Sequence, residues 1–280
     1  MESFFSFLER RVDDCSSLLC VGLDPHLPEL PEPTPRAALG FCMRLIDGTA
    51  AYAAAFKPNA AFFELLGPEG WDVLRQVIEA VHAQSTRLGS RIPVILDAKR
   101  GDIASTAQAY AASAFEKLGA DAVTLSPFLG SDSIEPFLQN QEKGAFLLCR
   151  TSNPSAGDIQ DVKVQLPGYE NAMPLHEWVA RLAAQWNSRN NLGLVVGATH
   201  TPTLAAVRAT VPDMWILCPG VGPQGGDLEA AVAAGLRADG RGLLVNVSRA
   251  LSRSDDPRKA AAALRDRVSE SQSRGRRHTA

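Results

Sequence analysis

The chain has 280 residues, of which 45% are hydrophobic and 21% are charged, and its formal net charge is -3 at pH 7. This length and composition allow a large buried core in one or two domains, and the slightly negative charge argues against nucleic acid as the main partner. No apolar run approaches the length of a membrane-spanning helix, so we expect no membrane partner.

The five cysteines are scattered and form no CxxC pair, which favours small core residues in a reducing compartment over disulfides or a zinc site. Residues 1–14 predict an amphipathic helix with mixed charges, without the apolar core and cleavage site of a signal peptide. We therefore expect a cytoplasmic protein.

After this helix the chain alternates between short apolar strands and helices. The predicted strands are 18–23, 55–56, 92–96, 122–125, 145–149, 192–196, 215–218 and 243–247. The predicted helices that follow them are 36–53, 69–88, 102–118, 131–141, 174–190, 202–210, 227–238 and 257–270. Residues 151–173 interrupt this rhythm with a long polar, turn-rich loop, a candidate lid or binding loop.

Eight buried strands that alternate with helices predict an α/β fold, a single (β/α)8 TIM barrel with an extra N-terminal helix. The barrel domain is expected to cover residues 1–270, followed by a disordered polar and basic tail at 271–280. An open doubly wound sheet is the alternative architecture, which the strand count disfavours.

Residues 92–103, IPVILDAKRGDI, change abruptly from apolar to charged. Alternation along the strand predicts that Asp97 and Lys99 project to the same side, while Gly101 turns the backbone and Asp102 starts the next helix. An ion pair and a helix cap would explain these residues without any function. Their place at the carboxyl end of a strand favours a site, because barrels bind their ligands there.

Polar residues also follow most of the other strands, and in a barrel they would face one mouth. The residues collected at the strand ends are Asp24, Lys57, Asn59, Asp97, Lys99, Ser152, Gln224 and Arg249. The glycine-rich segment 219–227, PGVGPQGGD, together with Arg249 after the next strand, predicts a phosphate site, because exposed backbone N–H groups and a guanidinium both bind anions.

Two lysines among carboxylates indicate proton or carbanion chemistry, since neighbouring anions favour the charged ammonium. The chain has no GxSxG, HExxH or Walker motif. Metal binding by Asp97 and Asp102 stays open, although the lysines would compete with the ion for these carboxylates.

Several motifs in order resemble the orotidine 5′-phosphate decarboxylase family, in its longer bacterial subgroup. These motifs are FKPN at 56–59, LDAKRGDI at 96–103 with Thr106, RTSNPS at 150–155, PGVGPQGGD at 219–227 and Ser248-Arg249. The resemblance spans residues 18–249, nearly the whole chain.

The resemblance implies decarboxylation of orotidine 5′-phosphate to uridine 5′-phosphate without cofactor or metal, by a homodimer. It implies that Lys99 protonates C6 of the pyrimidine and that Lys57, Asp97 and Asp102 complete an alternating array. Asp102, with Ile103 and Thr106, is expected to come from the partner subunit. The implied substrate contacts are Asp24 and Asn59 to the ribose, Ser152 to the pyrimidine, and Gln224 and Arg249 to the phosphate.

Two other functions remain as alternatives. A magnesium-dependent hexulose-phosphate aldolase of the same superfamily shares the DxKxxD pattern, but Lys57 disfavours it. A non-catalytic nucleotide-binding barrel would keep the phosphate site without needing the complete lysine-carboxylate array.

Overall fold

The protein is described here by a computed structural model, which covers residues 2–221 and 225–278. Its main sheet has eight parallel strands in the order β2-β1-β10-β9-β8-β5-β4-β3. Parallel bridges from Phe56 to Val94 and from Asn59 to Asp97 join the two edges, so the sheet closes into a barrel. The predicted TIM barrel is confirmed, and the open-sheet alternative is wrong.

The barrel strands are short, and each contributes its carboxyl end to the same mouth. Their bounds are β1 (Leu19–Leu23), β2 (Ala55–Pro58), β3 (Ile95–Arg100), β4 (Ala122–Leu125), β5 (Gly144–Arg150), β8 (Leu192–Val196), β9 (Ile216–Cys218) and β10 (Leu243–Val247).

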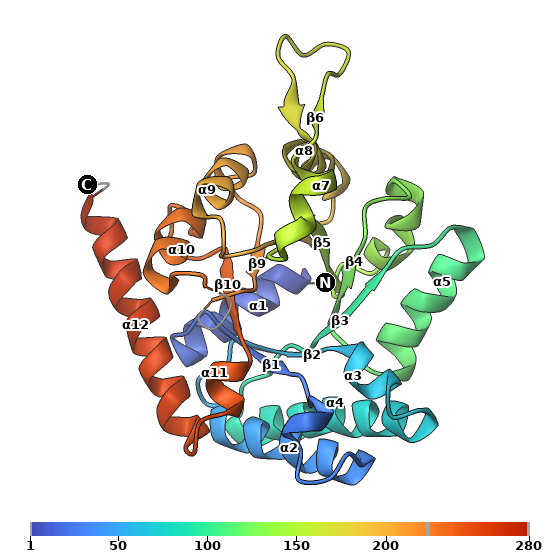
Figure 1. Ribbon diagram of the computed structural model, residues 1–280, viewed down its shortest axis with the longest axis vertical. Coiled ribbons are helices and arrows are strands. Elements are labelled where there is room, and N and C mark those ends of the chain that lie inside the picture. The colour runs from blue at the N-terminus through green and yellow to red at the C-terminus, as the bar shows by residue number, and fades with distance from the viewer. Residues whose placement is uncertain (1, 222–224, 279–280) are drawn as a thin grey trace.

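Helices surround the barrel, with α5 and α12 on opposite flanks (Figure 1). The helices before β5 are α1 (Phe4–Cys15), α2 (Pro35–Thr49), α3 (Ala60–Glu64), α4 (Pro68–Leu88), α5 (Ala104–Ala112) and α6 (Glu135–Leu138). Those after β5 are α7 (Gly157–Gln160), α8 (Leu175–Trp186), α9 (Thr201–Thr210), α10 (Leu228–Gly235), α11 (Arg249–Ser252) and α12 (Pro257–His278).

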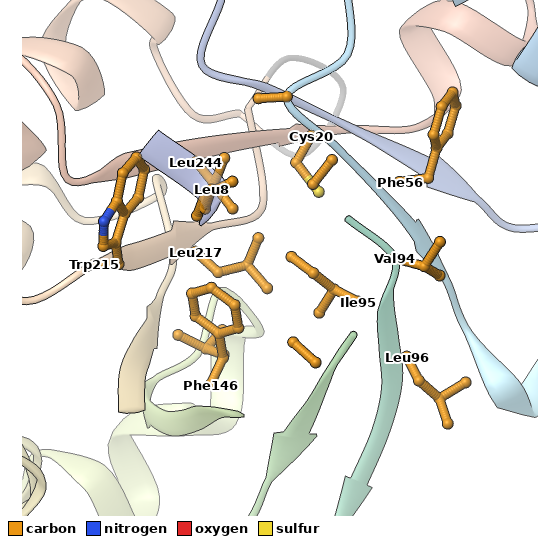
Figure 2. Packing of buried hydrophobic residues seen from close by; sticks show 14 of the residues in the cluster. Leu8, Cys20, Phe56, Val94, Ile95, Leu96, Phe146, Trp215, Leu217 and Leu244 are labelled. Atoms are coloured by element: carbon orange, nitrogen blue, oxygen red, sulfur yellow. The ribbon is translucent and has the colours of Figure 1, made fainter. Parts of the chain in front are cut away.

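Alternation along each strand divides its side chains between the barrel interior and the surrounding helices. On β3, Ile95 points toward Leu217 and Phe146, whereas Val94 and Leu96 point to the other side (Figure 2). The next inward position after Ile95 is Asp97, so this alternation carries the carboxylate from the apolar core up to the mouth.

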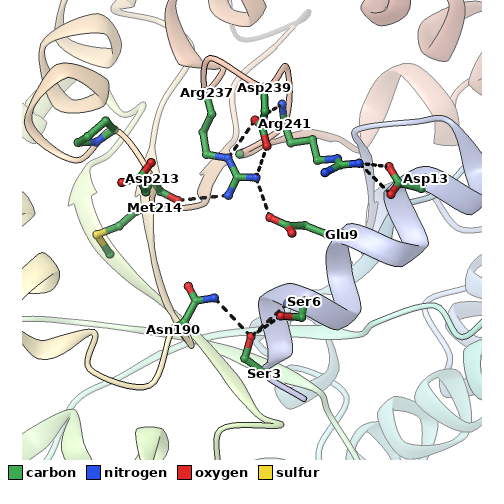
Figure 3. A network of polar contacts seen from close by, with 12 residues as sticks. Ser3, Ser6, Glu9, Asp13, Asn190, Asp213, Met214, Arg237, Asp239 and Arg241 are labelled. Atoms are coloured by element: carbon green, nitrogen blue, oxygen red, sulfur yellow. Dashed lines mark hydrogen bonds and ion pairs between the residues drawn. The ribbon is translucent and has the colours of Figure 1, made fainter. Parts of the chain in front are cut away.

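Helix α1 closes the end of the barrel opposite the mouth. The ring of Phe5 stacks on Trp215 with 6.2 Å between ring centroids and meets Phe146 edge-on at 5.7 Å. On its polar face, Glu9 and Asp13 pair with arginines of the segment after α10 (Figure 3). The extra N-terminal helix therefore acts as a plug for the apolar interior.

Several predicted element boundaries differ from the structure. The helix expected at 102–118 begins at Ala104, because the backbone is still extended at Ile103. Its C-terminal part is a π-helical turn, Ser113–Lys117. The helix expected at 131–141 is a 3₁₀ turn, Ser131–Ser133, followed by α6, since Pro136 cannot continue a helix and lies in the first turn of a new one.

The loop at 151–173 contains elements that the sequence did not predict. It holds α7 and the antiparallel pair β6 (Lys163–Val164) and β7 (Met173–Pro174), a hairpin that projects beyond the helices (Figure 1).

Residues 271–278, expected to form a polar and basic tail, continue α12 in the structure. The side chain of Ser271 is buried, and the Gln272 amide Nε2 donates a hydrogen bond to the Gly240 carbonyl at 2.8 Å. These contacts hold a further turn of the helix against the barrel.

Candidate active site

The centre of the site is a bulge at the end of β3. The pairing of β3 with β4 shifts between Leu96 and Arg100, and Lys99 lies in the left-handed backbone region with φ 48°. Only a constrained environment retains a non-glycine residue in this region. The bulge brings the Lys99 Nζ within 2.7 Å of Asp97 Oδ1, so the two side chains reach the same side as predicted.

Thr124 on β4 holds this bulge in place. Its Oγ1 accepts hydrogen bonds from the backbone N–H groups of Ala98 at 3.0 Å and Lys99 at 2.9 Å. The same hydroxyl donates to Asp97 Oδ1 at 2.9 Å. One hydroxyl thereby uses both of its acceptor sites and its one donor on the bulge.

Lys57 on β2 completes a Lys-Asp-Lys cluster. Its side chain is nearly buried, and its Nζ donates to Asp97 Oδ2 at 2.9 Å. Burial alone would lower the pKa of Lys57, but the carboxylates of Asp97 and Asp24 outweigh it and raise this pKa above its ordinary value. Lys57 is therefore a fixed positive charge beside Asp97.

The Asp97 carboxylate lies between the two ammonium groups. Burial alone would raise its pKa, but Lys57 and Lys99 outweigh burial and hold the pKa of Asp97 well below its ordinary value. The site at neutral pH thus contains a buried anion with a cation on each oxygen.

Two adjoining cavities open at the mouth of the barrel. The first, of ≈ 440 Å³, contains the Lys-Asp-Lys cluster and Ser152, and we call it the lysine cavity. The second, of ≈ 310 Å³, contains Ser248 and Arg249, and we call it the arginine cavity. Four residues line both cavities: Asp24, Asn59, Pro219 and Asn246. The two cavities therefore form one elongated site with the cationic cluster at one end and Arg249 at the other.

Close backbone contacts position the two loops that carry Ser152 and Arg249. A Cβ added to Gly197 would lie 2.8 Å from the Cα of Ser152, and one added to Gly22 would lie 2.8 Å from the Cβ of Ser248. Glycine at these two strand ends lets the loops approach closely.

Asn59 has a structural role in addition to lining both cavities. It caps α3 by accepting a hydrogen bond at Oδ1 from the backbone N–H of Ala61 at 3.2 Å. Its amide oxygen keeps one acceptor site and its amide nitrogen two donor sites for the predicted ribose contact.

Four predicted site residues are not placed in either cavity by the described chain. Asp102, Ile103 and Thr106 lie outside both linings, with Ile103 54% exposed. Asp102 does not cap a helix two or three residues on, since its Oδ1 accepts only from the neighbouring N–H of Ile103, at 2.8 Å. Gln224 lies outside the described residues.

The cavity linings include polar residues that the sequence analysis missed: Thr124, Gln160 and Asn246. Thr124 and Asn246 are single polar residues inside apolar strands, at the depth of Asp97, and that interruption was the available signal. No sequence signal pointed to Gln160, because its position depends on how the loop folds back at α7. There its Oε1 accepts a hydrogen bond from the backbone N–H of Thr151 at 2.9 Å.

Within residues 2–221 and 225–278 no group of three or more His, Cys, Asp or Glu side chains is arranged to hold a metal ion. In the same part of the chain, no helix combines the length and apolar character that spanning a membrane requires.

A TIM barrel with a lysine-carboxylate cluster and an arginine pocket at the mouth defines a class of barrel enzymes that act on phosphate esters. The sequence profile of the family "Orotidine 5'-phosphate decarboxylase / HUMPS" matches residues 17–264. The chain belongs to this family.

Two relatives and one solved structure of this family match the chain over nearly their full length. The chain is 49% identical over 267 residues to orotidine 5'-phosphate decarboxylase of Roseiflexus castenholzii, covering 94% of this chain and 93% of that protein. It is 46% identical over 277 residues to the protein of the same name from Thermomicrobium roseum, with 95% of each covered. The solved structure of Leishmania donovani OMP decarboxylase superposes with a TM-score of 0.85 at 49% identity, covering 97% of this chain and 99% of that one.

Proposed function

We infer that the chain catalyses decarboxylation of orotidine 5′-phosphate to uridine 5′-phosphate and carbon dioxide, the last step of de novo pyrimidine synthesis. The observation that carries this inference is the Lys57-Asp97-Lys99 cluster in a cavity continuous with the Arg249 pocket. Relatives that share 46–49% of its sequence carry this enzyme name.

The two cavities suggest one orientation of the nucleotide. Arg249 in the arginine cavity binds the phosphate, with Gln224 as a second ligand, because a guanidinium matches phosphate in charge and geometry. Ser152 in the lysine cavity binds the pyrimidine. Asp24 and Asn59 line both cavities and contact the ribose between these ends.

In this orientation the C6 carboxylate of the substrate lies beside the lysine-carboxylate cluster. When the bond from C6 to the carboxylate carbon breaks, its electron pair stays on C6 and carbon dioxide leaves. The Lys99 ammonium stabilises this carbanion and then transfers a proton to C6, after which the amine regains a proton from water. No cofactor takes part, so the stabilisation is electrostatic.

A preorganised cation in a site from which water is excluded can supply much of the roughly 8–23 kcal/mol by which enzymes commonly lower barriers. Lys57 fixes Asp97, and Thr124 fixes both Asp97 and the backbone of Lys99, so little reorganisation accompanies the reaction. Binding of the remote phosphate contributes free energy that drives closure of the site, and this closure lowers the barrier to reaction at C6.

We further propose that the enzyme is a homodimer in which Asp102, Ile103 and Thr106 enter the partner's site. Within one chain these residues lie outside both cavities: Asp102 and Ile103 are on the loop after β3, and Thr106 is in the first turn of α5. The loops after β3 and β4 expose Ile103 at 54%, Phe128 at 85% and Leu129 at 46%. Apolar side chains gathered on adjacent loops are typical of an interface.

We also propose a cytoplasmic location, which the five free and buried cysteines support, because a reducing compartment keeps thiols unpaired.

An absorbance assay tests the function. Purified protein mixed with orotidine 5′-phosphate should remove the substrate band and form uridine 5′-phosphate at the same rate with and without a chelator. An unchanged band would contradict the decarboxylase, and hexulose-phosphate turnover that the chelator abolishes would establish the aldolase instead.

A further inference from the structure

Asn246 is a buried amide whose oxygen has no partner within residues 2–221 and 225–278. It lies on β10 at an inward position, its residue is 9% exposed, and its Oδ1 is buried without a hydrogen bond in the described chain. The preceding position on the same face of β10 is Leu244, which is apolar and fully buried.

A second buried asparagine shows what a structural role looks like in this fold. The Oδ1 of Asn191 is also unpaired, but its Nδ2 donates to the backbone carbonyls of Leu138, Asn140 and Lys143. These three bonds tie the start of β8 to the segment before β5. For Asn246 no comparable bond exists among the residues that the structure describes, so structure alone does not explain why this position is polar.

The position of Asn246 indicates what pairs with it. It lines both the lysine cavity and the arginine cavity. Asp24 lines both as well, and its Oδ1 is likewise buried and unpartnered. Where the two cavities meet, two buried oxygens that have no partner in the described part of the chain form a built site for a ligand that carries hydroxyl groups.

We propose that Asn246 is a sugar-binding residue that hydrogen-bonds a ribose hydroxyl of the nucleotide beside Asp24. This inference rests on the nucleotide orientation proposed above. Ser248 and Arg249 line only the arginine cavity, whereas Lys99 and Ser152 line only the lysine cavity. The part of the nucleotide between phosphate and pyrimidine is the ribose, and its hydroxyls both donate and accept hydrogen bonds, as the carboxamide does.

The test is Asn246→Leu, which keeps the branched outline of the side chain and removes the amide. Titration calorimetry with uridine 5′-phosphate should give an affinity about tenfold weaker than wild type, the usual worth of a hydrogen bond to a ligand hydroxyl. The same titration is made with 2′-deoxyuridine 5′-phosphate and 3′-deoxyuridine 5′-phosphate. One of these ligands lacks the hydroxyl that Asn246 binds, and its affinities for wild type and for Asn246→Leu should agree within about twofold. The urea midpoint of the variant should equal or exceed that of wild type, since a desolvated polar group is gone.

Asn191→Leu is the matched control, and it should lower the urea midpoint without changing the ranking of the three nucleotides. Wild-type affinity in Asn246→Leu, or an equal loss for all three nucleotides, would overturn the proposal. If Asn246→Leu does not fold, Asn246→Ala replaces it, and its affinities for the three nucleotides are compared with those of wild type in the same way.

Arg249→Ala separates this inference from the proposed orientation. It should weaken uridine 5′-phosphate binding strongly and uridine binding little. Equal weakening of both ligands would show that the phosphate lies elsewhere, whatever the result at Asn246.

Discussion

Thr124 shows how one side chain determines the geometry of the reacting groups. Its hydroxyl bonds two backbone N–H groups of the β3 bulge and the Asp97 carboxylate, and its side chain is buried. Lys99 sits at φ 48°, a conformation that costs free energy unless its surroundings enforce it. The threonine is therefore a positioning residue for both Asp97 and Lys99.

Thr124→Val keeps the shape and removes the hydroxyl. We expect kcat to fall about 10- to 100-fold, because small misplacements of reacting groups are costly. The free energy of unfolding should fall by about 1–3 kcal/mol, since two backbone N–H groups of the bulge lose their acceptor. Absorbance kinetics and urea unfolding measure the two effects, and Thr124→Ser should restore most of both. A valine variant with wild-type kcat would disprove the positioning role.

The lowered pKa of Asp97 predicts an acid limb of stability. In the folded chain its carboxyl stays ionised below its ordinary pKa of 3.8, where the unfolded chain binds a proton. This contribution to the free energy of unfolding is present above that value and is lost as the pH falls below it. Urea unfolding at pH 3 to 7 should show a stability gap between wild type and Asp97→Asn that narrows below pH 4; a constant gap would contradict the pKa shift.

At the scale of single residues, the sequence indicated the charged members of the site, because charges at strand ends stand out from apolar runs. It could not indicate Thr124 or the bulge, since these depend on how β3 and β4 align. It also could not show that Asn59 spends its amide oxygen on capping α3.

Helix α1 is the element with the clearest structural purpose. Its apolar residues recur at helical spacing, so its amphipathic character was predictable, but the surface it covers was not. Phe5 is 2% exposed and packs on Trp215 and Phe146, which close the barrel interior away from the site.

Phe5→Ala should reduce the free energy of unfolding by about 3–5 kcal/mol, because it leaves a cavity under the barrel. The kcat of the folded fraction should be unchanged, since the mouth lies at the other end. Arg10→Ala, on the exposed face of α1, is the control and should stay within about 0.5 kcal/mol of wild type by urea unfolding. A kcat loss in folded Phe5→Ala would show that the plug also shapes the site.

Elements without a strong periodic pattern were predicted less well. The hairpin of β6 and β7 has two-residue strands, too short for any alternation to register. The last turns of α12 are polar, and the hydrogen bond that ties them to the barrel runs from Gln272 to the distant carbonyl of Gly240.

For the whole molecule, the count of eight strand-helix units was enough to predict a closed barrel, because closure follows from strand number and right-handed crossovers. The association of two chains could not be read in this way. It is proposed from the exposed residues Ile103, Phe128 and Leu129 and from the position of Asp102 outside the linings of both cavities in its own chain.

Mixing two inactive variants tests this association. In a homodimer whose sites share residues, Lys99→Ala and Asp102→Ala each lack activity, but a mixed dimer has one site with both residues intact. Equal mixing after unfolding and refolding should recover about one quarter of wild-type activity, since half of the dimers are mixed and each has one working site. If mass spectrometry shows mixed dimers but no activity is recovered, Asp102 acts in the site of its own subunit or has no role in the reaction.

The most direct test of the central claim, that Lys99 stabilises and protonates the C6 carbanion, is the turnover of Lys99→Ala on orotidine 5′-phosphate, measured beside its affinity for uridine 5′-phosphate. Our account predicts a kcat loss on the order of 10³-fold or more, with product affinity within about tenfold of wild type, because the lysine acts mainly on the developing charge. Lys163→Ala, on the exposed hairpin, should match wild type in both measurements. A Lys99→Ala enzyme that keeps kcat within about tenfold of wild type would contradict the account.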